Sequence, residues 1–345
     1  MKFNNVVIES FDYHLPDTSI TSDHIEARLA PLYERLKLPE GRLELMTGIT
    51  ERRAWELGTK PSSLSTMAAK KCLDKSKINP ADIDLLIHAA VCRDFLEPAT
   101  ASVVHANLGL SPHAMIFDLS NACLGVLNAI VVAANMIESK QIKRALIVSG
   151  ENSGPLLENT INELLNNPQI NRKNIKKYIA NLTIGSAATA IVISDESLAP
   201  HAPKILGGAV MTDSSANHLC QGDGNPHSLI METDSEELLK YGIRLGINTW
   251  KKAKENLSWN QEDVHFVLTH QVGSAHEKLS LESLELTNKN TFKTYPFLGN
   301  TGSSALPVTL MMAAEKNLIK NNEKIALLGI GSGLSSIMLG VKWSC

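Results

Sequence analysis

Long apolar runs are missing from this 345-residue sequence. No uncharged apolar segment reaches about 18 residues, the length that a helix needs to cross a bilayer. The first residues, Met1 to Asn5, also lack the apolar run of a signal peptide. Neither a membrane span nor a leader is therefore indicated, and we expect a cytoplasmic protein.

An excess of basic charge is missing as well. The 33 Lys and Arg residues stand against 36 Asp and Glu residues, which leaves a net charge of −3. Binding to nucleic acid depends on basic side chains that displace counterions from the phosphates. This balance therefore argues against nucleic acid as a main partner.

Paired cysteines are also absent. The chain has five cysteines and no C-x-x-C pair: Cys72, Cys92, Cys123, Cys220 and Cys345. Such scattered positions indicate neither a zinc site nor a disulfide framework, so we predict no metal. An odd number of cysteines in a reducing compartment leaves room for one reactive thiol.

What the sequence does contain is an alternation of short apolar strands and amphipathic helices. Strands are predicted at 6–8, 83–90, 114–117, 144–150, 187–194, 205–212, 263–270 and 325–329, and helices at about 21–36, 62–75 and 99–108. This alternation is typical of a layered α/β protein.

The second half of the chain repeats the plan of the first. The segment 263–270 resembles 82–89 at an offset of about 180 residues, and 325–329 matches the strand at 145 at the same offset. We predict two pseudo-symmetric halves, 1–195 and 196–345. The polar, Asn-rich stretch at about 151–181 is expected to be a surface excursion from the first half.

Cys123 lies between a short apolar strand and a helix of small and apolar residues. A cysteine at the start of a helix faces unpaired N–H groups and the positive end of the helix dipole, which lowers its pKa and favours the thiolate. The alternative is a packed core cysteine, because free cysteine is among the most buried residue types.

Two further polar residues lie at the ends of core elements. His270 ends a strand, and Asn300 begins a helix in the second half, at the place that Cys123 occupies in the first. Cysteine paired with histidine is the usual arrangement for covalent acyl transfer. Taken singly, His270 could be a structural histidine and Asn300 a helix cap; their shared placement favours catalysis.

These residues carry a resemblance to a known family. The set resembles the thiolase-fold condensing enzymes, specifically the β-ketoacyl-acyl-carrier-protein synthase III group. Four segments carry the resemblance: the TGIxERR-like Thr47 to Arg53, the nucleophile segment Phe117 to Cys123, the segment Gly299 to Ala305, and the glycine loop Gly331 to Leu334. The resemblance covers essentially the whole chain.

The resemblance implies a five-layered α-β-α-β-α fold with Cys123 as nucleophile in the first half and His270 and Asn300 in the second. The loop Gly331, Ser332 and Gly333 would supply part of an oxyanion hole. Acyl-CoA or acyl-carrier-protein thioesters are the implied substrates, with no tightly bound cofactor.

A sharper resemblance points to the head-to-head condensing enzymes of bacterial olefin biosynthesis. It rests on Arg93 to Ser102, on His270 to Val272 with His276, and on Leu327 to Leu334. Those enzymes join two fatty acyl-CoA molecules to a 2-alkyl-3-oxo acid without decarboxylation. In them a glutamate that matches Glu97 reaches the active site of the neighbouring subunit, which implies a homodimer.

Glu97 suits that chemistry. An acyl thioester that is not a malonyl thioester must lose an α-proton, which requires a positioned base. We expect burial against Phe95 and Leu96 to raise the pKa of the Glu97 carboxyl. The alternative is a solvated loop glutamate, or one that caps the following helix.

Departures from the synthase III pattern favour the same interpretation. His270-Gln271-Val272 lacks the asparagine and arginine of that group's HQAN-x-R pattern, and Arg42 replaces a tryptophan that stacks on CoA. These departures weaken the expectation that a carrier protein docks here. A basic helical face that could still receive one is formed by Arg244, Lys251, Lys252 and Lys254. The alternatives are a decarboxylating synthase III that uses malonyl-carrier protein, and a non-catalytic acyl-binding protein on the same fold.

Overall fold

Ten strands form one mixed β-sheet in the computed structural model, which describes residues 1–222 and 229–344. In sheet order they are β12 (Asn290–Thr291), β11 (Phe266–Thr269), β13 (Lys324–Gly331), β14 (Ser335–Lys342), β8 (Lys204–Thr212), β1 (Val6–His14), β7 (Ala187–Asp195), β6 (Arg144–Glu151), β4 (Leu85–Ala89) and β5 (Met115–Leu119).

The sheet consists of two five-stranded halves with the same internal order. From the centre outward, β1, β7, β6, β4 and β5 correspond to β8, β14, β13, β11 and β12. In each half the outer pairs are parallel and the inner pairs are antiparallel. The halves join where β1 pairs with β8 at Val7 and Lys204. We propose the units 1–195 and 196–345, because this division falls between the end of β7 and the start of β8.

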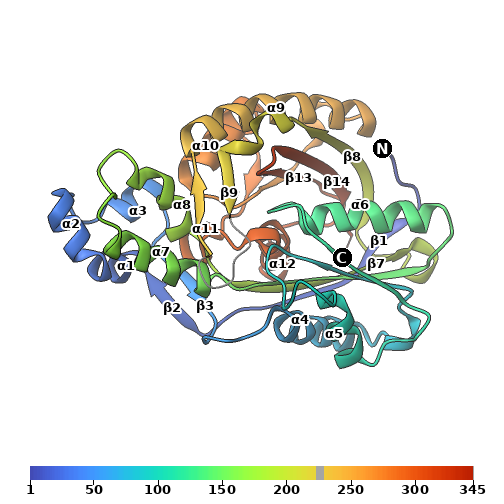
Figure 1. Ribbon diagram of the computed structural model, residues 1–345. Coiled ribbons are helices and arrows are strands. Elements are labelled where there is room, and N and C mark those ends of the chain that lie inside the picture. The colour runs from blue at the N-terminus through green and yellow to red at the C-terminus, as the bar shows by residue number, and fades with distance from the viewer. Residues whose placement is uncertain (223–228, 345) are drawn as a thin grey trace.

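Helices cover both outer faces and also fill the space between the halves of the sheet (Figure 1). Helices α4 (Pro61–Ser76) and α5 (Thr100–Leu108) cover one outer face, and α9 (Ser235–Leu257) and α10 (Ser274–Ser283) lie on the other side of the molecule. Between the half-sheets lie α6 (Gly125–Glu138) and α12 (Ala305–Glu315). The five-layered α-β-α-β-α arrangement that the resemblance implies is therefore present.

Strand periodicity explains the layers. In β4, Leu85 and Ile87 belong to the central core with α6 and α12, while Leu86 packs in the outer core with α4 and α5. In β13, Ile325 and Leu327 face the same central core, whereas Leu328 packs toward α9. Because successive side chains point to opposite faces, strands buried on both faces read as continuous apolar runs.

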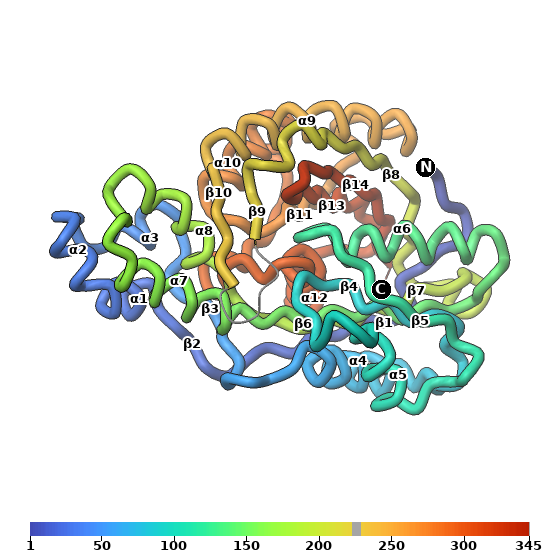
Figure 2. The backbone as a smooth tube through the Cα atoms, viewed as in Figure 1, coloured from blue at the N-terminus to red at the C-terminus, as the bar shows by residue number. Residues whose placement is uncertain are grey.

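A helical lobe projects from one end of the sheet, at the left of Figure 2. It consists of α1 (Ser22–Arg28), α2 (Ala30–Leu36), α3 (Arg42–Thr47), α7 (Gly154–Asn166) and α8 (Ile179–Leu182). The expected surface excursion at 151–181 supplies α7 and α8, but it is not merely peripheral. Leu157, Ile161 and Leu164 are buried against Ile25 and Leu29 in a core cluster of their own.

The single helix expected at about 21–36 is two helices. The side chain of Thr21 caps α1 by accepting a hydrogen bond from the N–H of His24, as helix-start chemistry predicts. The chain then breaks at Leu29, and Pro31 lies in the first turn of α2. Proline lacks the N–H that a continuous helix requires and is tolerated only in a first turn.

The expected buried strand at 114–117 is instead an edge strand. β5 pairs only with β4 in the sheet, and the Met115 side chain is 53 % exposed. An apolar edge strand with unpaired backbone groups is a template for pairing with another chain. No helix in the described ranges is long and apolar enough to span a membrane.

Candidate active site

Cys123 lies in a tight turn between β5 and α6. The helix begins at Gly125, two residues after Cys123, although Ser120 and Asn121 are residue types that favour a helix start. Ala122 has φ = +46°, a left-handed conformation that is uncommon for a residue with a side chain. Such backbone strain persists only where surrounding contacts enforce it. Here Ser303 supplies one, because its hydroxyl donates a 2.7 Å hydrogen bond to the Ala122 carbonyl.

Burial decides the protonation state of Cys123. Desolvation, followed by the nearby charge of Glu151, raises the pKa of its thiol to about 12. Hydrogen bonds from its own backbone N–H and from the Asn300 side chain lower this pKa, but by less. The expectation that the helix start makes Cys123 a thiolate is therefore wrong for the free protein. The helix begins two residues after Cys123, and burial raises the thiol pKa by more than the helix dipole can lower it.

His270 follows β11 directly, and its backbone N–H donates to the Leu328 carbonyl at 2.9 Å. The residue is 7 % exposed, and neither ring nitrogen has a hydrogen-bond partner among the residues that the structure describes. Burial, with a smaller contribution from His276, lowers the pKa of the His270 imidazole to about 4. A neutral imidazole with unpartnered nitrogens can accept the proton of a thiol.

Asn300 is placed by a turn between α11 (Tyr295–Leu298) and α12. Its side-chain oxygen accepts from the Gly302 N–H at 3.1 Å, and its backbone N–H donates to the Thr183 carbonyl at 3.0 Å. Gly299 has φ = +66°, and a Cβ atom there would lie 2.5 Å from the Thr183 oxygen. Only glycine fits this position, and the turn brings the Asn300 side chain to hydrogen-bond Cys123.

Gly331 closes the other side of Cys123. It ends β13, and a Cβ atom there would lie 3.0 Å from Leu124 Cγ and 3.7 Å from Cys123 Cβ. The backbone at Gly331 therefore packs closely against Cys123 and Leu124. Ser332 and Gly333 continue the loop toward β14, and their part in an oxyanion hole stays a prediction.

Glu97 is exposed, in the loop that joins β4 to α5. Phe95 and Leu96 beside it are 40 % and 90 % exposed. Within one chain these side chains do not bury Glu97, contrary to the sequence-based expectation. The base of the loop is fixed, because the Asp94 carboxylate accepts from the Ser62 N–H at 2.8 Å and from its hydroxyl at 2.5 Å.

Sequence reasoning missed Glu151. The polar excursion expected at about 151–181 would begin at this residue, yet Glu151 ends β6 and is only 4 % exposed. Its carboxylate accepts hydrogen bonds from the backbone N–H groups of Val91, Cys92 and Ser303 at 3.0, 3.2 and 2.9 Å. The available signal was its place at the carboxyl end of a central strand, where the sheet also delivers Cys123.

The basic helical face proposed for a carrier protein is partly neutralised. Arg244 pairs with Asp213 at 3.2 Å, and Lys252 pairs with Glu255 at 3.1 Å. Lys254 stacks over the Trp250 ring. No group of three or more potential metal ligands occurs among the described residues.

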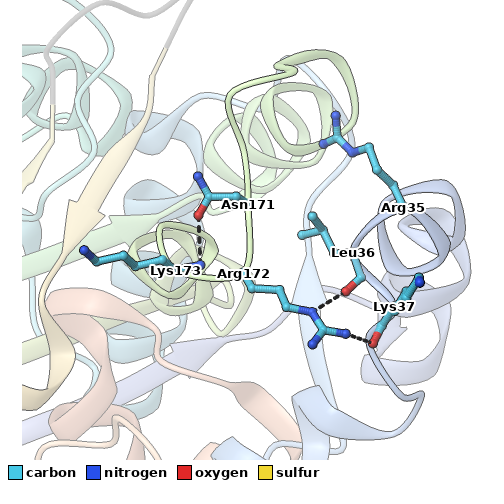
Figure 3. Close-up of a pocket in the computed structure, with 6 residues that line it drawn as sticks. All are labelled: Arg35, Leu36, Lys37, Asn171, Arg172 and Lys173. Carbon is cyan, nitrogen blue, oxygen red and sulfur yellow. Dashed lines mark hydrogen bonds between the residues drawn. The ribbon is translucent and has the colours of Figure 1, made fainter.

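A separate surface hollow of about 510 Å³ lies in the helical lobe (Figure 3). None of the predicted site residues lines it. The Arg172 guanidinium donates to the carbonyl oxygens of Leu36 and Lys37, so it serves to cap α2. The side chains of Arg35 and Lys173 point in different directions, and the basic groups therefore do not converge on one ligand position.

Comparison with known proteins decides the family. Residues 44–198 match the model of the thiolase N-terminal domain, and residues 255–343 match that of the 3-oxoacyl-[acyl-carrier-protein] synthase III C terminal. The acyl-CoA:acyl-CoA alkyltransferase of Shewanella oneidensis is 38 % identical, over 99 % of this chain and 100 % of that protein. Its counterpart from Xanthomonas campestris is 36 % identical over the same shares.

The chain belongs to the acyl-CoA:acyl-CoA alkyltransferase family. Solved structures agree. The present chain matches the crystal structure of Xanthomonas campestris OleA with bound lauric acid and lauroyl-CoA. The TM-score is 0.94 and the sequence identity is 35 %, over 99 % of this chain and 100 % of that one. The β-ketoacyl-[acyl-carrier-protein] synthase III of Natranaerobius thermophilus is more distant, at 26 % identity over 99 % of this chain and 100 % of that protein. The family makes this chain an acyltransferase of the thiolase-like condensing type.

Proposed function

We propose that the protein condenses two fatty acyl-CoA molecules head to head, through an acyl-Cys123 intermediate and without decarboxylation. The observation that carries the choice is its similarity over the full chain to two acyl-CoA:acyl-CoA alkyltransferases, at 36 % and 38 % identity, against 26 % for a synthase III. The product is a 2-alkyl-3-oxo acid once the remaining thioester is hydrolysed.

The first half-reaction acylates Cys123. The neutral His270 imidazole takes the thiol proton, and the sulfur attacks the carbonyl carbon of the first thioester. The backbone N–H groups of Cys123 and of the Gly331 to Gly333 loop stabilise the oxyanion. The carbon–sulfur bond of the substrate breaks, and CoA leaves with the proton that His270 had accepted.

The second half-reaction forms the carbon–carbon bond. The carbonyl of a second acyl-CoA accepts hydrogen bonds from His270 and Asn300, which stabilise the enolate. The partner subunit's Glu97 removes the α-proton. The α-carbon attacks the acyl-Cys123 carbonyl, the bond to sulfur breaks, and the thiolate of Cys123 regains a proton from the acid that Glu97 has become.

We propose a homodimer in which Glu97 crosses the interface. Three observations support it: the open edge of β5, the 53 % exposure of Met115, and the 90 % exposure of Leu96 beside Glu97. Exposed apolar side chains at a free sheet edge are typical of a surface that a second chain covers. We further propose that the enzyme has no tightly bound cofactor, because every step uses side chains and thioester substrates only. We also propose that it is cytoplasmic.

The deciding experiment incubates purified protein with myristoyl-CoA alone. We expect free CoA and a long-chain 2-alkyl-3-oxo acid, which loses carbon dioxide on heating to give a ketone. A strict requirement for a malonyl thioester would instead establish the decarboxylating synthase III reaction. Intact-mass spectrometry that finds no acyl adduct on Cys123 with any thioester would establish a non-catalytic acyl-binding protein.

A further inference from the structure

Glu151 is a buried carboxylate that none of the proposed chemical steps uses. It lies at the end of β6 with 4 % of its surface exposed, and its carboxylate accepts hydrogen bonds from three backbone N–H groups and from the Cys92 side chain. Burying a carboxylate is costly unless such bonds compensate for lost water. The groups that hydrogen-bond to the Glu151 carboxylate should therefore explain why a carboxylate is buried at this position.

The three N–H groups belong to two segments of the site. Val91 and Cys92 begin the loop that carries Glu97, and Ser303 belongs to the turn that carries Asn300. One carboxylate oxygen, Oε1, accepts from both Val91 and Ser303. The loop and the turn are thus held at a common point, although more than 200 residues separate them in sequence.

A third segment joins through Ser303. While its N–H donates to Glu151, its hydroxyl donates to the carbonyl of Ala122, directly before Cys123. The space is closed on both sides, because a Cβ atom on Gly302 would lie 2.8 Å from Glu151 Oε1, and one on Gly125 would lie 2.9 Å from Ser303 Oγ. Small movements of the carboxylate would therefore displace the nucleophile turn as well.

We propose that Glu151 is a positioning residue that fixes the loop carrying Glu97 relative to the segments carrying Cys123 and Asn300. The inference rests on the proposed function, in which those three side chains supply base, nucleophile and enolate donor. In a dimer with Glu97 crossing the interface, one carboxylate then aligns the nucleophile of its own site and the base of the partner's site.

Electrostatics provides a readout that a purely structural role would not change. The charge of Glu151 raises the pKa of the Cys123 thiol, beside the larger effect of burial. The other groups that act on Cys123 are Cys220, which also raises its pKa, and Asn300, which lowers it; His270 is uncharged at neutral pH. Removing the charge of Glu151 should therefore make Cys123 more reactive toward an alkylating agent, even while catalysis is lost.

The test compares Glu151→Gln and Glu151→Asp with the wild-type protein. Glu151→Gln removes the charge and turns one acceptor into a donor; Glu151→Asp keeps the charge but is too short for all three N–H groups. We expect both to lower product formation at least roughly tenfold, since a misplacement of about 1 Å can cost on the order of a hundredfold. Iodoacetamide should alkylate Cys123 several-fold faster at pH 8 in Glu151→Gln, and at the wild-type rate in Glu151→Asp.

Glu26→Gln is the matched control. Glu26 is 6 % exposed and accepts hydrogen bonds from the backbone N–H groups of Gly41 and Leu43, but in the lobe. We expect it to lose stability while product formation and Cys123 alkylation stay unchanged. Peptide mass spectrometry separates alkylation of Cys123 from that of Cys92, whose pKa the Glu151 charge also raises.

Each outcome decides for or against the inference. Normal product formation in Glu151→Asp or Glu151→Gln overturns it, and so does an equal loss of product in Glu26→Gln. If Glu151→Gln does not fold, Glu151→Asp carries the product comparison. If the wild-type protein forms no product from myristoyl-CoA alone, that result contradicts the proposed function instead. The role of Glu151 is then still tested by the alkylation rates, and by product formation from the thioester pair that the protein does use.

Discussion

Cys123 and His270 both lie where burial favours an uncharged side chain. The pKa of Cys123 is raised to about 12 and that of His270 is lowered to about 4. The pair at rest is therefore a thiol and a neutral imidazole, not a thiolate and an imidazolium. An uncharged pair avoids the cost of burying two ions before the substrate arrives, and the proton moves only when an acyl thioester is in place.

The lowered pKa of His270 predicts a loss of stability in acid. A group with a depressed pKa contributes stability above its unfolded value, near 6.5, and loses it as the pH falls toward the folded value, about 4. At pH 5 the loss should be about 2 kcal/mol. We expect His270→Asn to lose less unfolding free energy than wild type between pH 7 and pH 5, measured by urea denaturation.

The comparison isolates His270 because all other titratable groups are shared by the two proteins. His276 has a lowered pKa from burial too, and it contributes to the pKa of His270; His276→Asn is therefore the matched control for a neighbouring buried imidazole. Identical pH dependence in wild type and His270→Asn would contradict a neutral, buried His270.

Asn300 allows the two half-reactions to be separated. Removing an oxyanion donor typically costs about 2.7–4 kcal/mol in activation free energy. We expect Asn300→Ala to lower condensation by roughly a hundredfold or more, while acyl-Cys123 still forms with myristoyl-CoA, as detected by intact-mass spectrometry. Asn162→Ala, at an exposed position in α7, is the control. Normal condensation in Asn300→Ala would remove Asn300 from the proposed mechanism.

Among the structural elements, the turn before α12 has little conformational freedom. Gly299 and Gly109 have similar left-handed φ values, +66° and +60°, but a Cβ atom would meet the Thr183 oxygen at 2.5 Å at Gly299 and nothing within 4 Å at Gly109. Their ψ angles differ: Gly109, at ψ = +40°, is in the left-handed helical region, where alanine costs about 1–2 kcal/mol, whereas Gly299, at ψ = −162°, is in a region that is essentially restricted to glycine. Gly299→Ala therefore adds both a larger backbone cost and the steric clash.

We expect Gly299→Ala to abolish most condensation, because the clash displaces the turn that holds Asn300. Gly109→Ala, at the end of α5, should keep full condensation while losing about 1–2 kcal/mol of unfolding free energy. Product formation from myristoyl-CoA and thermal denaturation measure the two effects. Equal activity in both variants would show that the turn relaxes around the added methyl group.

The elements also show where sequence patterns mislead. Ser120 and Asn121 are favourable helix-start residues, yet α6 begins at Gly125. Asn121 uses its side-chain amide to donate to Asn128 Oδ1 at 2.7 Å, and Ser303 holds the Ala122 carbonyl. Contacts from a segment about 180 residues away in sequence thus override a local capping preference.

At the scale of the whole molecule, the proposed exchange of Glu97 between subunits predicts complementation. Cys123→Ala and Glu97→Ala should each be inactive as homodimers. In a mixed dimer, the Glu97→Ala chain supplies Cys123 and receives Glu97 from its partner. We expect mixing after partial denaturation, or co-expression with two different tags, to restore up to about half of the wild-type activity per mixed dimer, since one of its two sites is complete.

Mixed preparations that stay inactive would place the base within the same chain or on another residue. The control pairs Cys123→Ala with Asn300→Ala. Both substitutions affect side chains that meet within one chain, since Asn300 hydrogen-bonds Cys123. In that mixed dimer each site lacks one of the two, so no complete site forms and no activity should return.

Much of the site was predictable because chemistry and periodicity are local properties of a sequence. The half-chain repeat, the strands buried on both faces, and the positions of Cys123, His270 and Asn300 at the ends of core elements all follow from residue type and spacing. The structure brings Asn300 and Gly331 against Cys123 as that pattern implies. The catalytic roles themselves stay proposals until the variants are measured.

Other properties were decided only by the tertiary structure. The protonation state of Cys123 depends on desolvation and on the charge of Glu151, and neither is visible from a helix-start motif. Glu151 itself looked like the first residue of a polar excursion, because its three N–H partners come from segments distant in sequence. The sequence by itself thus determined which groups can react; the packed fold determined their charge and alignment, because burial and long-range hydrogen bonds exist only once the chain has folded.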